Sequence, residues 1–130
     1  MEIAAFYENI AQGASALNIS VKEALLSLKE KGMTRVYMCD RTFYDVKDTL
    51  IPVLKALNIG IEGFFAFGDY GHCPDSEDYK ELVDLAKDQG AGNVLIVPGF
   101  VGRDEKAQEE TLIKNMIHGM ANAAAYGKKM

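Results

Sequence analysis

The sequence predicts an α/β fold in which four consecutive strand–helix units form one domain over residues 1–130. Short apolar runs recur along the chain, and each is followed by a stretch with a single apolar stripe at helical spacing. The runs cover residues 3–7, 35–39, 62–67 and 93–98. They are continuous rather than alternating, which is typical of strands buried on both faces. A βαβαβαβα order predicts parallel strands joined by right-handed crossovers.

Composition limits the class of protein. The chain has 130 residues, 48% hydrophobic and 25% charged, as in an ordinary globular domain. A net charge of −5 argues against non-specific binding to nucleic acid or to anionic membranes. No apolar run reaches the ~18 residues of a membrane span. Two cysteines, Cys39 and Cys73, cannot build a disulfide framework and, with an acidic segment at residues 2–8, indicate a cytoplasmic protein.

The first two helices are predicted from caps and stripes. Ser20 and Glu23 form a capping box before an apolar stripe at residues 21–28, and Gly32 is the expected stop. The second stripe covers residues 50–57 and ends at Asn58 and Gly60. Pro52 falls inside this second pattern, so we expect it in the first helical turn, where proline is tolerated.

The third helix is expected to open at Asp75 or Ser76 and to end at Gly90, and the fourth to cover residues 105–126. The stripe of the fourth helix consists of Leu112, Ile113, Met116, Ile117, Met120 and Ala124. Periodicity alone leaves two architectures open. One is a doubly wound sheet with helices on both faces, and the other is a barrel segment with all helices outside.

Five segments carry a family resemblance: residues 5–10, 20–25, 32–36, 64–72 and 93–100. Together they resemble the N-terminal half of the sugar phosphate isomerase/epimerase family, the xylose isomerase-like TIM barrels that include the endonuclease IV relatives. The resemblance implies a (βα)₄ half of a TIM barrel, since a complete barrel needs ~250 residues. It also implies that the main catalytic acids and most divalent-metal ligands of the family, on strands five to eight, have no counterpart here.

A half-barrel would expose one sheet face and two strand edges, so we expect a homo-oligomer. The simplest form is a homodimer whose two halves close into eight strands. The alternatives are a flattened layer covered by another copy, or a separate chain that supplies strands five to eight. Alternation suggests a set of inward residues, with the opposite phase left open: Ala4, Phe6, Val36, Met38, Phe65, Phe67, Leu95 and Val97.

The active site of such a barrel lies at the carboxyl ends of the strands. The resemblance implies that Tyr7 and His72 line a sugar pocket, with His72 as the catalytic candidate. Further candidates for binding a small sugar at these ends are Glu8, Asp40, Phe67, Asp69 and Phe100. The structural alternatives are a half-buried tyrosine and a loop histidine bonded to backbone.

A divalent metal is possible by resemblance, but no ligand set is assigned. Cys39, Asp40, His72 and Cys73 are donor types at consecutive strand ends, although they lack ligand spacing. Glu105 is interpreted as part of a solvated acidic face.

The sequence and its resemblance leave two functions open. The first is a self-associating half-barrel without full catalytic activity by itself. The alternative is an active metal-dependent sugar isomerase/epimerase once dimerised or complemented.

Overall fold

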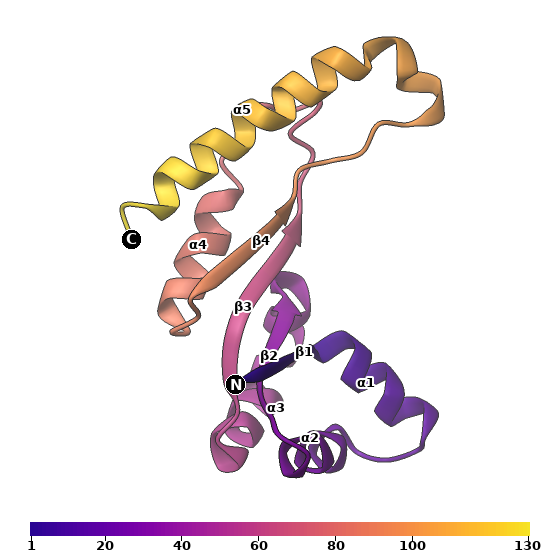
Figure 1. The fold of residues 1–130 in the computed structure, drawn as a ribbon, viewed down its shortest axis with the longest axis vertical. Coiled ribbons are helices and arrows are strands. Elements are labelled where there is room, and N and C mark those ends of the chain that lie inside the picture. The colour runs from indigo at the N-terminus through magenta and orange to yellow at the C-terminus, as the bar shows by residue number, and fades with distance from the viewer.

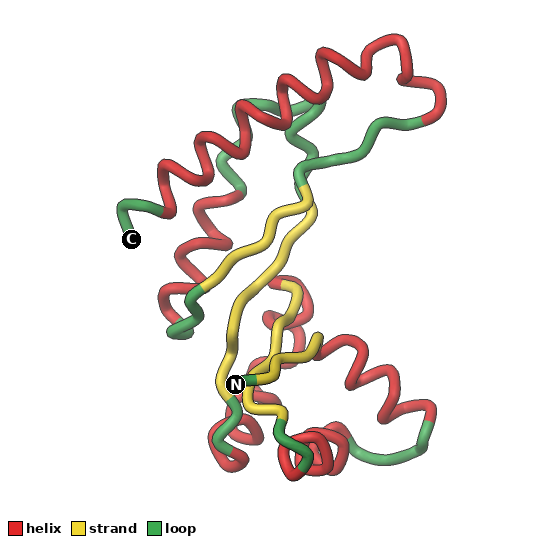
Figure 2. The backbone as a smooth tube through the Cα atoms, in the orientation of Figure 1, coloured by secondary structure: helices red, strands yellow, loops and turns green.

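The computed structural model describes residues 1–130 and confirms an α/β fold with a four-stranded parallel sheet (Figure 1). The strands are β1 (Ile3–Phe6), β2 (Met33–Cys39), β3 (Gly60–Phe67) and β4 (Asn93–Val97). The helices are α1 (Tyr7–Ala16), α2 (Val21–Glu30), α3 (Asp40–Leu57), α4 (Tyr79–Asp88) and α5 (Glu109–Gly127), with a 3₁₀ helix η1 (Arg103–Gln108) before α5. Strands and helices alternate along the chain except that α1 and α2 both follow β1, and η1 and α5 both follow β4 (Figure 2).

The strand order is β1-β2-β3-β4, and each neighbouring pair is parallel. A doubly wound sheet reverses its order at a switch point, whereas this sheet never does. Right-handed crossovers in a sequential order carry every helix to the same face. The arrangement is therefore compatible with half of a TIM barrel.

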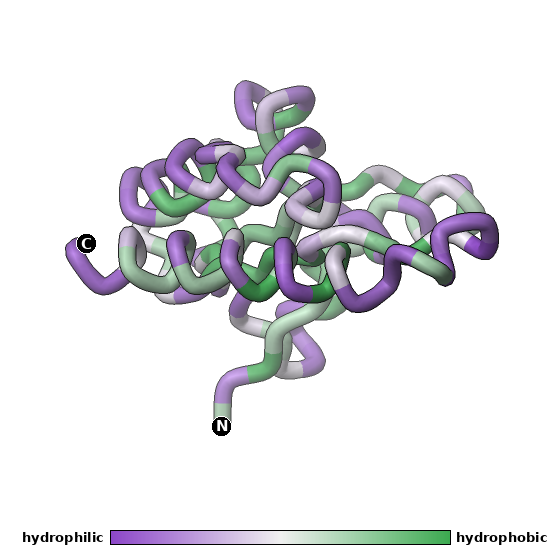
Figure 3. Tube along the Cα trace, turned by 90° about the horizontal axis from the view of Figure 1, so that it is seen from above, coloured by the Kyte–Doolittle hydropathy of each residue, from purple (hydrophilic) through white to green (hydrophobic).

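One core cluster confirms that the first four helices share a face. It joins buried residues of α1, α2, α3 and α4 to Val36 and Met38 of β2 and to Phe64 of β3, all three fully buried. Phe43 of α3 meets Phe64 with ring centroids 5.2 Å apart. Hydrophobic segments gather in the middle of the molecule, and hydrophilic ones lie on its outer turns (Figure 3).

The other face of the sheet carries no helix. We call it the open face and define it by the residues that follow the phase of Phe6: Phe6, Tyr37, Phe65, Phe67, Leu95 and Val97. Its aromatic rings form a band across three strands. The ring centroid of Phe6 lies 5.6 Å from those of both Tyr37 and Phe65, and the centroids of Phe65 and Phe67 are 6.1 Å apart. Phe67 is 60% exposed and Leu95 is 53% exposed. An apolar surface of this kind is uncommon on a monomer.

On β2 the structure selects the opposite phase, which the sequence had left open. Val36 and Met38 face the helices, while Tyr37 belongs to the open face. A short strand that is apolar on both sides gives no signal of phase, so only pairing could decide it. The pairing is also irregular, with a register shift between Val36 and Tyr37.

The helix stops were predicted well, whereas several starts were not. Gly32, Asn58 and Gly90 each follow a helix with a positive φ, as expected of C-terminal stops. Helix α1 was not predicted, because its buried side includes only Tyr7, Ile10 and the small Ala14. The fourth predicted helix divides into η1 and α5.

Helices α3 and α4 also differ from the prediction. Pro52 lies well inside α3, because that helix begins at Asp40 and is anchored by the buried Phe43 more than two turns before the proline. Helix α4 begins at Tyr79 rather than at residues 75 or 76, after a turn at residues 70–75.

Candidate functional site

The parallel strands end at one edge of the sheet, so the segments that follow them lie along the same edge. Barrel enzymes place their active sites at this edge. Of the predicted site residues, Glu8 follows β1, Asp40 follows β2, Asp69 and His72 follow β3, and Phe100 follows β4.

His72 lies between two carboxylates from different loops. Its Nδ1 is 2.7 Å from Oδ1 of Asp69, and its Nε2 is 2.5 Å from Oε2 of Glu105. Only the imidazolium form has a proton on each nitrogen to donate to both partners. The hydrogen bond with Asp69, followed by that with Glu105, raises the pKa of His72. The same bonds lower the pKa of Asp69 and of Glu105.

Glu105 also orders its own loop. Its Oε1 accepts a hydrogen bond from the Gly102 amide at 3.1 Å while its Oε2 holds His72. The β3–α4 loop and the segment that follows β4 are therefore joined through one side chain. The sequence interpretation placed Glu105 on a solvated face, which was wrong. The three-residue spacing from Gly102 could have predicted the local bond, as at other helix starts, but not the contact with His72.

A second polar group joins the ends of β1 and β2. Oε1 of Glu8 accepts a hydrogen bond from the Cys39 amide at 2.7 Å, whereas its buried Oε2 has no partner. Asp40 accepts from the Cys39 thiol at 3.4 Å and from the Arg41 amide at 2.7 Å. Burial is the main cause that raises the pKa of the Cys39 thiol. No hydrogen bond links this group to the group of His72.

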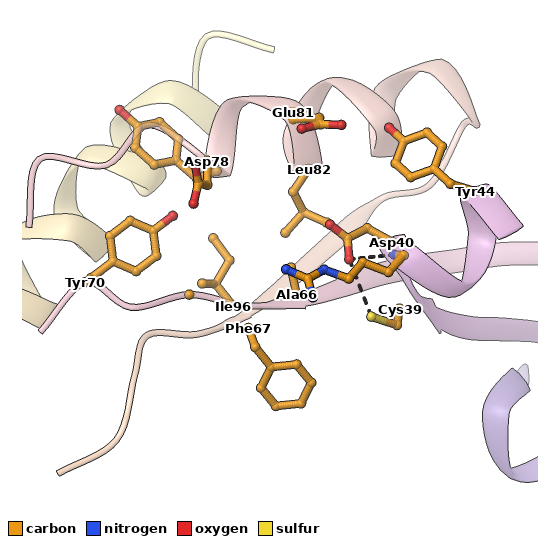
Figure 4. Close-up of a pocket in the computed structure, with 13 residues that line it drawn as sticks. Cys39, Asp40, Tyr44, Ala66, Phe67, Tyr70, Asp78, Glu81, Leu82 and Ile96 are labelled. Carbon is orange, nitrogen blue, oxygen red and sulfur yellow. Dashed lines mark hydrogen bonds between the residues drawn. The ribbon is translucent and has the colours of Figure 1, made fainter. Parts of the chain in front are cut away.

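A cavity of about 290 Å³ opens between the ends of β2 and β3 and the starts of α3 and α4 (Figure 4). Its wall includes the carboxylates of Asp40, Asp78 and Glu81 and the rings of Tyr44 and Tyr70. This volume is close to the lower limit of ordinary ligand pockets. The carboxylates could accept hydrogen bonds from the hydroxyl groups of a small polar ligand.

The aromatic candidates lie apart from these polar groups. Tyr7 is buried in the core among the helices, and burial is the main cause that raises its pKa. In Figure 4, Phe67 points away from the cavity, toward the opposite side of the sheet. Phe100 is 69% exposed. Of the predicted site residues, the structure brings Asp69 together with His72, and Glu8 and Asp40 meet at the intervening Cys39. Asp40 and Phe67 both line the cavity, although the Phe67 ring points out of it.

The donor set does not fit the divalent metal that the resemblance implies. No three His, Cys, Asp or Glu side chains converge in a way that could hold a metal ion. Asp69 and Glu105 occupy opposite nitrogens of the His72 ring, and those nitrogens point in divergent directions. Cys73 is exposed and free.

Comparison of the chain with protein-family models, curated proteins and solved structures finds no match. The family resemblance of the sequence therefore stays a prediction. None of the helices combines the length and the apolar character needed to cross a bilayer.

Proposed function

We propose that the chain is a half-barrel of the sugar phosphate isomerase/epimerase type that self-associates through its open face and binds a small sugar at the carboxyl ends of its strands. The observation that carries the proposal is the one-sided sheet. Its strands run in sequential parallel order, one face is covered by helices, and the other presents an exposed aromatic band. Barrel interiors are filled by apolar side chains from their strands in this way.

A homodimer satisfies the geometry of closure. A twofold axis along the barrel axis preserves strand direction, so β4 of one copy can pair in parallel with β1 of the other. The two junctions are then identical, as a closed twofold assembly requires. The two edge strands are also similar in length, with four residues in β1 and five in β4. A separate chain that supplies four strands is the second candidate.

The oligomeric state tests this assembly. We expect light scattering to give twice 14.3 kDa for the purified chain. Leu95→Lys puts a charge into the open face and should give a monomer, because an unpaired buried charge is strongly unfavourable. Leu26→Lys is the matched control, since Leu26 is 42% exposed on α2 and lies off that face. A folded monomeric wild type, or a Leu95→Lys variant that still dimerises, would overturn the proposal.

The proposed chemistry centres on His72. Held as an imidazolium by Asp69 and Glu105, His72 has both ring N–H groups engaged, so a sugar oxygen can accept a proton from the ring only by displacing one of the two carboxylates. Isomerisation or epimerisation next to a carbonyl also needs a base, and both nearby carboxylates are already bonded to His72. We therefore propose sugar binding without full turnover by one copy. The alternative, an active metal-dependent enzyme, needs donors from a second copy or from a complementary half.

Sugar binding and proton transfer can be measured separately. We expect pentoses, hexoses and their phosphates to shift the amide NMR signals of residues 69–72 saturably, and Asp69→Asn to weaken the effect. The absence of any saturable shift would contradict the sugar-binding proposal. Incubation in D₂O tests turnover, because deuterium gained at carbon beside the sugar carbonyl would favour the alternative function. Cys73→Ser is the control for Asp69→Asn, because Cys73 is exposed in the same loop and its substitution should leave sugar binding unchanged.

A further inference from the structure

Helix α5 carries an apolar surface that the rest of the chain does not cover. Its inner side packs through Leu112, Gly119 and Ala123, which are buried. Ile113 is 43% exposed and Ile117 is 63% exposed, although the sequence pattern predicts both within the buried stripe. The two isoleucines are four residues apart and so lie on one side of the helix, on successive turns. We call this surface, made of Ile113 and Ile117, the free side of α5.

A groove on the β1 side of the sheet, the side away from β4, is also apolar. It lies between α1 and α2 beside β1 and has a volume of about 510 Å³. None of its eleven lining residues is charged, and eight are hydrophobic. Leu17 and Ile19 in its wall are 73% and 38% exposed. The groove brings no charge into such a contact, and the charged neighbours of the two isoleucines on α5, Glu110 and Lys114, are exposed and pair with each other at 2.9 Å.

We propose that the free side of α5 in one copy docks into the α1–α2 groove of a second copy. The inference rests on the proposed half-barrel dimer. In a closed barrel, the helix that follows one strand covers the junction with the next strand. The strand next to β4 would be β1 of the partner, and the groove lies on the helix-covered flank of β1. Figure 1 places α1 and α5 at opposite ends of the molecule, so one copy cannot satisfy its own groove.

The buried area supports a contact of this kind. A stable interface buries about 800 Å² on each partner. Phe6 and Phe67 are the most exposed rings of the open face, at 43% and 60%. Leu95 is 53% exposed on the same face, and with about 200 Å² for a whole large side chain the three side chains offer roughly 300 Å² together, still well below that area. The open face therefore needs a second contact area, and the free side of α5 with its groove provides one in two equivalent places.

A cysteine pair tests the docking directly. Leu17→Cys and Ile117→Cys, combined on a Cys39→Ser/Cys73→Ser background, should form a disulfide-linked dimer under mild oxidation. The control pair, Leu26→Cys with Ile117→Cys, should not, since Leu26 is exposed on α2 but does not line the groove.

A charge variant provides a second readout. Ile117→Glu should weaken dimerisation by about 100-fold in sedimentation, because it buries a charge against an uncharged groove. Leu26→Glu should leave dimerisation unchanged. Circular dichroism checks the fold of both variants.

The outcomes separate the two proposals. A wild-type dimer that neither cross-links nor responds to Ile117→Glu overturns the docking and leaves the half-barrel dimer intact, with the groove free for another partner. A monomeric wild type overturns both. A cross-link that persists in Leu95→Lys would show that the helix contact forms without closure of the open face, which contradicts the closed-barrel dimer.

Discussion

The two faces of the sheet are both apolar, but helices cover one of them and leave the other exposed. Phe64 and Phe65 are neighbours in β3, yet Phe64 is fully buried beneath Phe43 of α3 whereas Phe65 belongs to the aromatic band of the open face. The difference comes from topology, since sequential right-handed crossovers bring the helices to one side only. Apolar character therefore indicates that a face will be covered, but not by which part of the assembly.

The largest expected effect comes from emptying the covered face. Phe64→Ala should lower the free energy of unfolding by about 3–5 kcal/mol, because it leaves a cavity in a fully packed core. Phe67→Ala on the open face should change the unfolding of a separated protomer by less than about 1 kcal/mol while it weakens dimerisation. Urea unfolding at low and high protein concentration measures both quantities. Equal losses from the two variants in the separated protomer would contradict the distinction between the faces.

A tight helix contact gives the next effect. A Cβ at Gly119 of α5 would lie 2.5 Å from Cδ1 of Tyr70, and that ring is itself buried. Gly119→Ala should therefore destabilise the fold by about 1–3 kcal/mol, despite the better helix propensity of alanine. Gly13→Ala in α1 is the control, since nothing lies within 4 Å of its added Cβ. It should stabilise by up to about 1 kcal/mol.

Both glycine variants are best measured in the Leu95→Lys background, which keeps association out of the unfolding curve. A neutral Gly119→Ala would show that α5 can move away from Tyr70. Such mobility would weaken the case for α5 as a rigid docking element.

The sequence predicts the features of this fold that depend on neighbouring residues, but not those that depend on residues far apart in the chain. Buried runs and helix stops are local signals, so the four strands and the stops at Gly32, Asn58 and Gly90 were predicted. Strand phase and order depend on partners distant in sequence, and so does the contact between His72 and Glu105. The charge pattern around Glu105 gives no sign of a partner 33 residues earlier.

A local cap should give a smaller effect. The Ser20 hydroxyl accepts a hydrogen bond from the Glu23 amide at 3.0 Å, as its capping box predicts. Ser20→Ala should cost about 1 kcal/mol of unfolding free energy. Ser15→Ala, inside α1, should be neutral or slightly stabilising because alanine is the better helix former. Thermal unfolding of Ser20→Ala and Ser15→Ala measures the difference. Equal midpoint temperatures would show that the Ser20 cap does not stabilise α2.

The smallest effect on stability concerns the two hydrogen bonds that hold His72 between Asp69 and Glu105, at the carboxyl ends of the strands. We call this group the His72 clamp. Because the folded pKa of His72 is raised above the ordinary 6.5, the stabilisation is complete below that value and is lost as pH rises through the folded pKa. Asp69 and Glu105 have lowered pKa values, so their contribution is lost as pH falls through those folded values. The clamp is therefore strongest in mildly acidic solution and weakens on either side.

NMR titration of the His72 ring can show whether the clamp belongs to one copy. Asp69→Asn should lower the pKa of His72 more than Glu105→Gln does, because Asp69 makes the larger contribution. Both carboxylates come from the same chain as His72, so the Leu95→Lys monomer should titrate as the wild-type dimer does. A different pKa in the monomer would mean that the partner reaches this edge. The polar ends of the strands would then depend on the second copy as the open face does, and the contrast would lie between the covered face and the rest of the sheet.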